Sequence, residues 1–210
     1  MKTKFVLFSG MMLLAIIACA SIGPQAPAAT PEPTPIPGWE KFEGSGVEIW
    51  MPDSFVGGDL EKDIETVTER LRSLGPDFEP TVQMIEQNPS LFKLWLFDTE
   101  VGSSGVLSNV NIISSPIMSS VTIDMYFDAV AQSFPDNFKL IAREKVTLKN
   151  YEAGRITTEF SITGTEGKQF LYLVLHDNNA WTITFTTGTS EFEERTPIFE
   201  QSMDTFKIVE

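Results

Sequence analysis

The stretch QFLYLVLHDNNAWTITFTT, residues 169–187, decides the fold. Its first part, Gln169 to His176, is apolar on both faces near its middle, and its second part, Ala180 to Thr187, alternates threonine with apolar residues. Runs of this kind are typical of β-strands. The intervening Asp-Asn-Asn at 177–179 favours a tight turn, so the two strands are predicted to pair antiparallel.

The rest of the chain contains further predicted strands and helices. Two more strands precede this hairpin through short turn-forming links, and helical periodicity and capping residues mark four helices. Helices are expected on both faces of one antiparallel sheet, which is an α+β fold class. The predicted strands are Val47–Met51, Leu91–Phe97, Val106–Ile113, Lys139–Leu148, Ala153–Thr163, Gln169–His176 and Ala180–Thr187. The first two predicted helices are Asp59–Leu74 and Val82–Gln87. A third helix is capped by Thr122 and runs to Phe134, and a last helix begins with a capping box of Ser190 and Glu193 and runs to Phe206.

The first eighteen residues have the pattern of a secretory signal peptide. Lys2 and Lys4 precede an apolar run from Phe5 to Ala18, which at fourteen residues is too short to cross a bilayer. The run ends on Ile-Ile-Ala-Cys at 16–19, which resembles the lipobox of bacterial lipoproteins. This resemblance implies that Cys19 receives diacylglycerol before residues 1–18 are removed. The alternative is an ordinary signal peptide in which Cys19 is incidental.

Residues 19–38 are predicted to be a tether between the acylated cysteine and the folded domain. Six prolines lie between Ala20 and Gly38 with a single charge, Glu32, so this segment cannot bury a core and favours extended polyproline II. A proline-rich ligand for an aromatic groove is the competing interpretation. From Trp39 to Glu210 the composition is that of one packed domain.

Composition excludes several classes of protein. The formal net charge is −14, so nucleic acid is not an expected partner. One cysteine and one histidine exclude an intramolecular disulfide and a Cys/His metal cage within one chain, and no cofactor or metal is expected.

The order of predicted elements resembles a known family. The strand ending in Met51-Pro52-Asp53-Ser54-Phe55, the aromatic strand from Trp181 to Phe185 and the terminal helix closing on Asp204-Thr205-Phe206 resemble the PsbP/Mog1-like α/β/α sandwich. This resemblance covers residues 39–210 and rests on no catalytic motif. It implies a role in binding, because members of that superfamily mostly act by binding.

Two short patterns in the sequence resemble parts of catalytic motifs. Ser90 and Lys93 match S-x-x-K, but in a strand residues three apart point to opposite faces, so this match is rejected. The pair His176-Asp177 lies at a turn, where a histidine hydrogen-bonded to its neighbour is expected rather than a general base.

A polar face of the sheet is the remaining candidate site. Alternation along three predicted strands indicates that threonines and basic residues share faces, and adjacent strands would combine them into one polar, locally basic surface. Such a surface is either solvated sheet or a docking site for an anionic ligand or an acidic partner. Its predicted members are Arg143, Lys145, Arg155, Thr157, Glu159, Thr182 and Thr184.

These observations predict a lipid-anchored, non-enzymatic accessory or binding protein on the extracytoplasmic side of a bacterial cell membrane. The membrane would be contacted through Cys19, and the further partner is an unidentified protein or small molecule. The alternatives are an envelope hydrolase whose site is assembled only by folding, and a lipoprotein that captures a small apolar ligand between sheet and helix.

Overall fold

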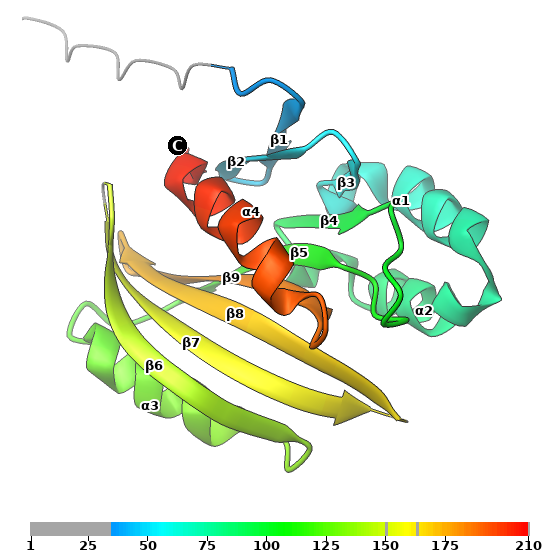
Figure 1. Cartoon of the computed structure of the whole chain (residues 1–210). Coiled ribbons are helices and arrows are strands. Elements are labelled where there is room, and N and C mark those ends of the chain that lie inside the picture. Colours follow the sequence, from blue (N-terminus) through cyan, green and yellow to red (C-terminus); the bar gives the residue numbers. More distant parts are fainter. Residues whose placement is uncertain (1–34, 150, 163, 210) are drawn as a thin grey trace, which may run out of the picture. The chain divides into compact units, whose positions relative to one another are not determined.

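The computed structural model describes residues 35–149, 151–162 and 164–209 (Figure 1). The predicted signal peptide, Cys19 and most of the predicted tether lie outside the described residues. Among the described residues, no helix is long and apolar enough to span a membrane.

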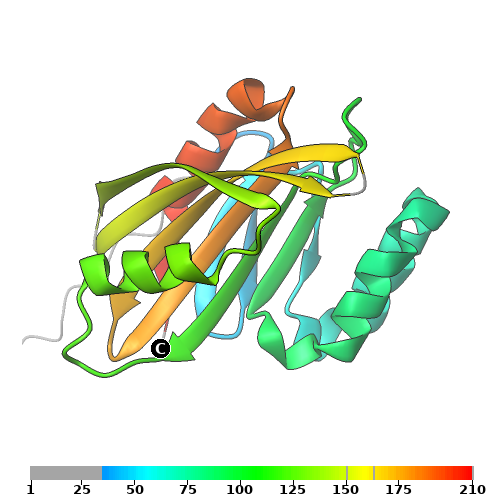
Figure 2. The ribbon, with the colours of Figure 1, turned by 90° about the horizontal axis from the view of Figure 1, so that it is seen from below.

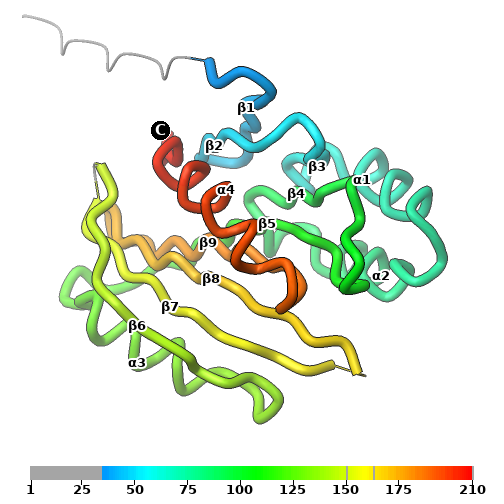
Figure 3. Tube along the Cα trace, in the orientation of Figure 1, coloured from blue at the N-terminus to red at the C-terminus, as the bar shows by residue number. Residues whose placement is uncertain are grey.

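The main sheet has seven strands, in the order β3-β4-β5-β9-β8-β7-β6, and all of its neighbouring strands are antiparallel. The last four strands form consecutive hairpins along the chain (Figure 3). The strands are β3 (Phe55–Gly58), β4 (Leu94–Asp98), β5 (Asn109–Pro116), β6 (Phe138–Leu148), β7 (Tyr151–Ile162), β8 (Thr165–His176) and β9 (Asn179–Gly188).

A second, smaller sheet has the order β1-β2-β10. Its strands are β1 (Trp39–Gly44), β2 (Val47–Pro52) and β10 (Lys207–Ile208). Strands β1, β3 and β10 are absent from the prediction because they are short or lie at sheet edges, where alternation of apolar residues is weak.

In residues 35–209 as described, four α-helices pack on the main sheet: α1 (Leu60–Leu74), α2 (Glu79–Gln87), α3 (Ile123–Ser133) and α4 (Phe192–Thr205). Two short 3-10 helices, Pro76–Phe78 and Pro89–Leu91, flank α2. Helix α4 covers one face of the sheet and α3 covers the other (Figures 1 and 2). The predicted α+β class, with helices on both faces of an antiparallel sheet, is confirmed.

The apolar side chains form three clusters that follow this arrangement. The largest lies under α4 and includes Phe185, Phe199 and Met203 together with β2. A second joins α1 and α2 to β4, and a third joins α3 to β7 and β8 through Phe127 and Ile156. The face opposite α4 is therefore covered by two separate groups of helices.

Local sequence signals explain most helix boundaries. Thr122 is the N-cap of α3, and its side chain accepts a hydrogen bond from the Met125 backbone N–H at 3.3 Å. The turn between β8 and β9 places Asp177 and Asn178 at positive φ, which these residues tolerate better than most.

The capping box predicted for the last helix is wrong. The N-cap of α4 is Glu191 instead of Ser190, and it makes no side-chain cap hydrogen bond. The Glu191 carboxylate is engaged elsewhere, since its Oε1 accepts a hydrogen bond from the Ser104 backbone N–H at 2.9 Å.

The strand predicted at 106–113 is also shifted, because β5 begins at Asn109.

Candidate functional site

The predicted polar face does not exist as one surface. In the β6–β7 register Arg143 lies opposite Ile156, whereas Glu144 lies opposite Arg155. Residues paired across antiparallel strands share a face, and neighbours along a strand alternate. Arg155, Thr157 and Glu159 therefore lie on the face that α4 covers, while Arg143, Lys145, Thr182 and Thr184 lie on the opposite face.

The three residues on the α4 face are occupied by contacts within the protein. The guanidinium of Arg155 donates hydrogen bonds to Glu144 at 2.7 Å and to Glu200 at 2.6 Å and lies 4.5 Å from the centre of the Phe170 ring. Burial lowers the pKa of Arg155, but the hydrogen bonds that Arg155 donates to Glu200, Tyr172 and Glu144 outweigh burial and raise the pKa above its ordinary value. Thr157 is buried, and Glu159 pairs with Lys168 at 3.4 Å. This network joins the sheet to α4.

Helix α3 contacts three of the four residues on the opposite face. On one side of the helix, Arg143 and Lys145 form ion pairs with Asp128 at 2.6 Å and Asp124 at 2.8 Å. The Thr182 hydroxyl contacts the Tyr126 hydroxyl at 3.1 Å, so Thr182 also joins the sheet to this helix. The locally basic surface expected from the sequence is therefore neutralised by acids of α3.

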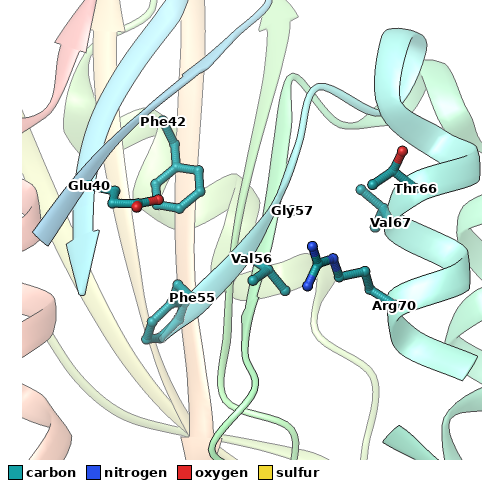
Figure 4. A pocket seen from close by; sticks show the side chains of 8 residues that line it. All are labelled: Glu40, Phe42, Phe55, Val56, Gly57, Thr66, Val67 and Arg70. Atoms are coloured by element: carbon teal, nitrogen blue, oxygen red, sulfur yellow. The ribbon is translucent and has the colours of Figure 1, made fainter. Parts of the chain in front are cut away.

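A pocket of about 210 Å³ lies elsewhere, at the free edge of the main sheet (Figure 4). Its walls come from β1, β3 and α1, and Phe55 and Val67 in these walls are buried. The sequence does not reveal this pocket, because β1 and β3, which form two of its walls, show no clear strand period. Its lining residues are Glu40, Phe42, Phe55, Val56, Gly57, Thr66, Val67 and Arg70.

Two opposite charges flank this mostly apolar pocket. Arg70 extends from α1 toward Val56, and Glu40 lies beside Phe42 on the opposite wall (Figure 4). Both side chains are exposed, and neither has an ion-pair or hydrogen-bond partner among the described residues. The pocket therefore offers one cation and one anion across an apolar floor.

Asp59 holds two walls of the pocket together. Its carboxylate accepts hydrogen bonds from the Ser45 hydroxyl in the β1–β2 turn at 2.7 Å and from the Glu61 backbone N–H at the start of α1 at 3.1 Å. Lys62 Nζ also lies 2.9 Å from it. Burial raises the pKa of Asp59, but these hydrogen bonds outweigh burial and hold the pKa below its ordinary value.

The His176-Asp177 pair lies in a shallow hollow of about 160 Å³ that also includes Ser119. His176 Nε2 is 3.2 Å from Asp177 Oδ2, and the Asp177 side chain is 75% exposed. In a Ser-His-Asp triad the acid is buried and the serine is hydrogen-bonded to histidine. In the described part of the chain Ser119 makes no such bond, so this hollow lacks the geometry of a triad.

No metal site is found in residues 35–149, 151–162 and 164–209. No group of three His, Cys, Asp or Glu side chains in these ranges is arranged to hold an ion.

Comparison with known proteins identifies the fold. No protein-family model and no curated protein sequence matches this chain. The solution structure of cyanobacterial PsbP (CyanoP) from Synechocystis sp. PCC 6803 is similar with a TM-score of 0.50 at 11% identity, covering 87% of this chain and 99% of that one. The crystal structure of LpqN, described as involved in cell envelope biogenesis of Mycobacterium tuberculosis, is similar with a TM-score of 0.53 at 10% identity, covering 78% of this chain and 83% of that one. The fold is therefore PsbP-like.

Proposed function

We propose that this chain is a lipid-anchored, extracytoplasmic binding protein without catalytic activity. We further propose that the pocket at the edge of β3 binds a small zwitterion with an apolar body, such as a branched or aromatic amino acid. The observation that carries this proposal is that Arg70 and Glu40 lie on opposite walls of an apolar pocket and have no ion-pair partner in the part of the chain that the structure describes.

The ligand class follows from the chemistry of the pocket. A carboxylate would pair with the Arg70 guanidinium, an ammonium group would pair with Glu40, and an apolar side chain would contact Phe42 and Val56. The volume of about 210 Å³ is enough for a ligand the size of a single amino acid.

The proposed anchor rests on the sequence. Cys19 is the only cysteine of the chain and follows an apolar run in the pattern of a lipobox. Two or more acyl chains hold a protein stably on a membrane, so such an anchor would need no help from the acidic domain. Metabolic labelling with a palmitate analogue should label the wild-type chain and should not label Cys19→Ser; equal labelling of both would refute the anchor.

The pocket is tested with a matched set of ligands on the full chain. Isothermal titration with leucine, with 4-methylpentanoate, which lacks the amine, and with 3-methylbutylamine, which lacks the carboxylate, separates the two charges. Leucine is expected to bind best, because it alone satisfies Arg70 and Glu40 together. Equal binding of leucine and 4-methylpentanoate would remove the role of Glu40.

Variants then assign the binding to the pocket. Arg70→Gln and Glu40→Gln should each weaken leucine binding by about tenfold, since each removes a charge-assisted hydrogen bond. Arg72→Gln is the matched control, because Arg72 is on the same helix but pairs with Glu79 and Glu86 and does not line the pocket. A loss of binding in Arg72→Gln equal to that in Arg70→Gln would contradict the assignment.

Hydrolysis is the alternative function and has its own test. Ser119, His176 and Asp177 share one hollow without the hydrogen bonds of a triad among the described residues, so these are the side chains to test. Screening generic ester, phosphate and glycoside substrates against the wild type, His176→Ala and Asp177→Ala would decide the question. Turnover that depends on His176 would overturn the proposal of a binding protein.

A further inference from the structure

The zwitterion pocket, as we call the pocket at the edge of β3, is lined by main chain as well as by side chains. Strand β3 is the outermost strand of the main sheet and pairs only with β4. Phe55 and Gly57 of this strand both line the pocket. An outermost strand has a row of backbone N–H and C=O groups that no neighbouring strand bonds. The direction of these groups in β3 therefore decides what else the pocket offers a ligand.

The pairing of β3 with β4 shows which residues of β3 have free backbone groups. In antiparallel strands, residues directly opposite each other alternate between hydrogen-bonded and non-hydrogen-bonded pairs. The Thr99 N–H donates to the Ser54 carbonyl at 3.0 Å, so this pair is a bonded one. In the same register the next bonded residue of β3 is Val56, and the residues on either side of it, Phe55 and Gly57, belong to non-bonded pairs.

A hydrogen bond on the other side of β4 gives the same result independently. The Asp98 N–H donates to the Ser108 carbonyl at 2.8 Å, just before β5, so the backbone groups of Asp98 face away from β3. Asp98 lies opposite Phe55, and Leu96, which alternation turns the same way, lies opposite Gly57. The N–H and C=O groups of Phe55 and Gly57 therefore point away from β4, toward the free edge of the sheet.

Gly57 presents its backbone groups to the pocket at close range. A glycine in a strand has no side chain to keep a ligand away from its main chain. Gly57 lies between Glu40 and Arg70, the two charged residues of the pocket (Figure 4). Among the described residues, no hydrogen bond from outside the sheet reaches its N–H or its C=O. The pocket therefore offers one free donor and one free acceptor in addition to its two charges.

We propose that Gly57 binds the ligand as a single added strand residue, which makes the pocket specific for free α-amino acids. This inference rests on the proposed function and narrows its ligand class. In a bonded antiparallel pair, each residue donates from its N–H to the partner's C=O and accepts at its C=O from the partner's N–H. A free α-amino acid has an ammonium and a carboxylate in the matching positions, on either side of one carbon.

Each charged group of the ligand then has two partners. The ammonium donates to the Gly57 carbonyl and to the Glu40 carboxylate, and the carboxylate accepts from the Gly57 N–H and from the Arg70 guanidinium. A β-amino acid has a second carbon between its charges, so it would fit the two charged side chains without matching both backbone groups of one residue. A residue within a peptide chain has neither charge, so it would lose the pairs with Glu40 and Arg70.

Two isomers test the inference by isothermal titration of the detergent-solubilised full chain. Leucine and β-leucine, which is 3-amino-4-methylpentanoate, have the same atoms, the same charges and a branched apolar body, and differ in the spacing of ammonium and carboxylate. Leucine should bind at least about tenfold more tightly, because β-leucine loses a backbone hydrogen bond to Gly57.

The outcomes separate this inference from the proposed function. Binding of β-leucine as tight as that of leucine, or tighter, would overturn the inference and leave a zwitterion pocket that recognises charge alone. Absence of binding by both isomers would refute the proposed function and the inference with it.

A variant tests whether the preference comes from the main chain. Gly57→Ala is unsuitable, because its Cβ would collide with the Trp95 carbonyl and disturb β4. Arg70→Gln should weaken the binding of both isomers but keep the preference for leucine at about tenfold, since the backbone of β3 is unchanged. Loss of the preference in Arg70→Gln would mean that the charged side chains set the spacing, and would overturn the inference.

Hydrogen exchange of backbone amides in the wild-type chain locates the contact without any substitution. Saturating leucine should slow the exchange of the Gly57 amide by about tenfold, because its N–H becomes bonded, and β-leucine should slow it less. The Gly105 amide is the matched control, because Gly105 does not line the pocket and should exchange at the same rate with and without leucine. An unchanged exchange rate of Gly57 in the presence of bound leucine would overturn the inference.

Discussion

Replacement of Asp59 by alanine should destabilise the domain and loosen the zwitterion pocket together. The carboxylate is 2% exposed and accepts hydrogen bonds from Ser45, Glu61 N–H and Lys62. Ser45 belongs to the β1–β2 turn and Asp59 caps α1, so the substitution removes a direct link between two walls of the pocket.

The expected cost follows from these contacts. Loss of the helix cap costs about 1 kcal/mol. Loss of the hydrogen bond from Ser45 to a charged, buried acceptor costs about 1.5–3 kcal/mol. Lys62 is 71% exposed, so solvent screens its ion pair and the pair contributes little. The cap and the Ser45 hydrogen bond together are worth about 2.5–4 kcal/mol, a large part of the stability of an ordinary domain.

The dependence on pH gives a second, independent measurement. The pKa of Asp59 is lower in the folded state than its ordinary value, so the ionised carboxylate favours folding. This stabilisation is present above about pH 4, the pKa of an unfolded aspartate, and is lost as the pH falls through the lower folded value. The difference between wild type and Asp59→Ala should therefore be smaller at pH 3 than at pH 7.

Urea unfolding followed by tryptophan fluorescence measures both effects. Asp77→Ala is the control, because Asp77 is exposed and makes no side-chain contact among the described residues, and its free energy of unfolding should change by less than about 0.5 kcal/mol. A change below about 0.5 kcal/mol in Asp59→Ala at pH 7, or an effect that grows in acid, would refute the reasoning.

Three further substitutions test the packing of α3 and the network of Arg155, each by urea unfolding. In Gly154→Ala a new Cβ would lie 2.1 Å from Phe127 Cζ, so the domain should lose about 1–3 kcal/mol, and Phe127→Leu in the same chain should recover part of it. Thr122→Ala should cost about 1 kcal/mol through the lost cap of α3; no change would mean that the cap is not formed in solution. Arg155→Lys should cost about 1.5–3 kcal/mol despite the conserved charge, because lysine cannot reproduce the bonds to both Glu144 and Glu200; full stability in this variant would show that the fork of the guanidinium is not needed.

The central hairpins could be predicted because local residues decide them. The apolar run from Gln169 to His176, the alternation from Ala180 to Thr187 and a turn at Asp177 and Asn178 are sufficient to define two paired strands. Helices α1 and α3 were equally predictable, since each has an apolar stripe and an N-capping side chain, Asp59 or Thr122.

The candidate sites were less predictable because they depend on register and on edge strands. A shift of one residue in pairing exchanges the faces of a strand. The register of β6 with β7, which shifts between Leu140 and Ala142, decides which of their residues share a face, and spacing along one strand contains no such information. The pocket was missed for a different reason: the four-residue strand β3 is too short to show any period.

The zwitterion pocket depends on Asp59 and on the contact of α1 with the edge of the sheet. Asp59→Ala should therefore weaken leucine binding, whereas Asp77→Ala, which does not line the pocket, should leave it unchanged. Unchanged leucine binding in Asp59→Ala would mean that the hydrogen bond from Ser45 to Asp59 is not what holds these two walls in place.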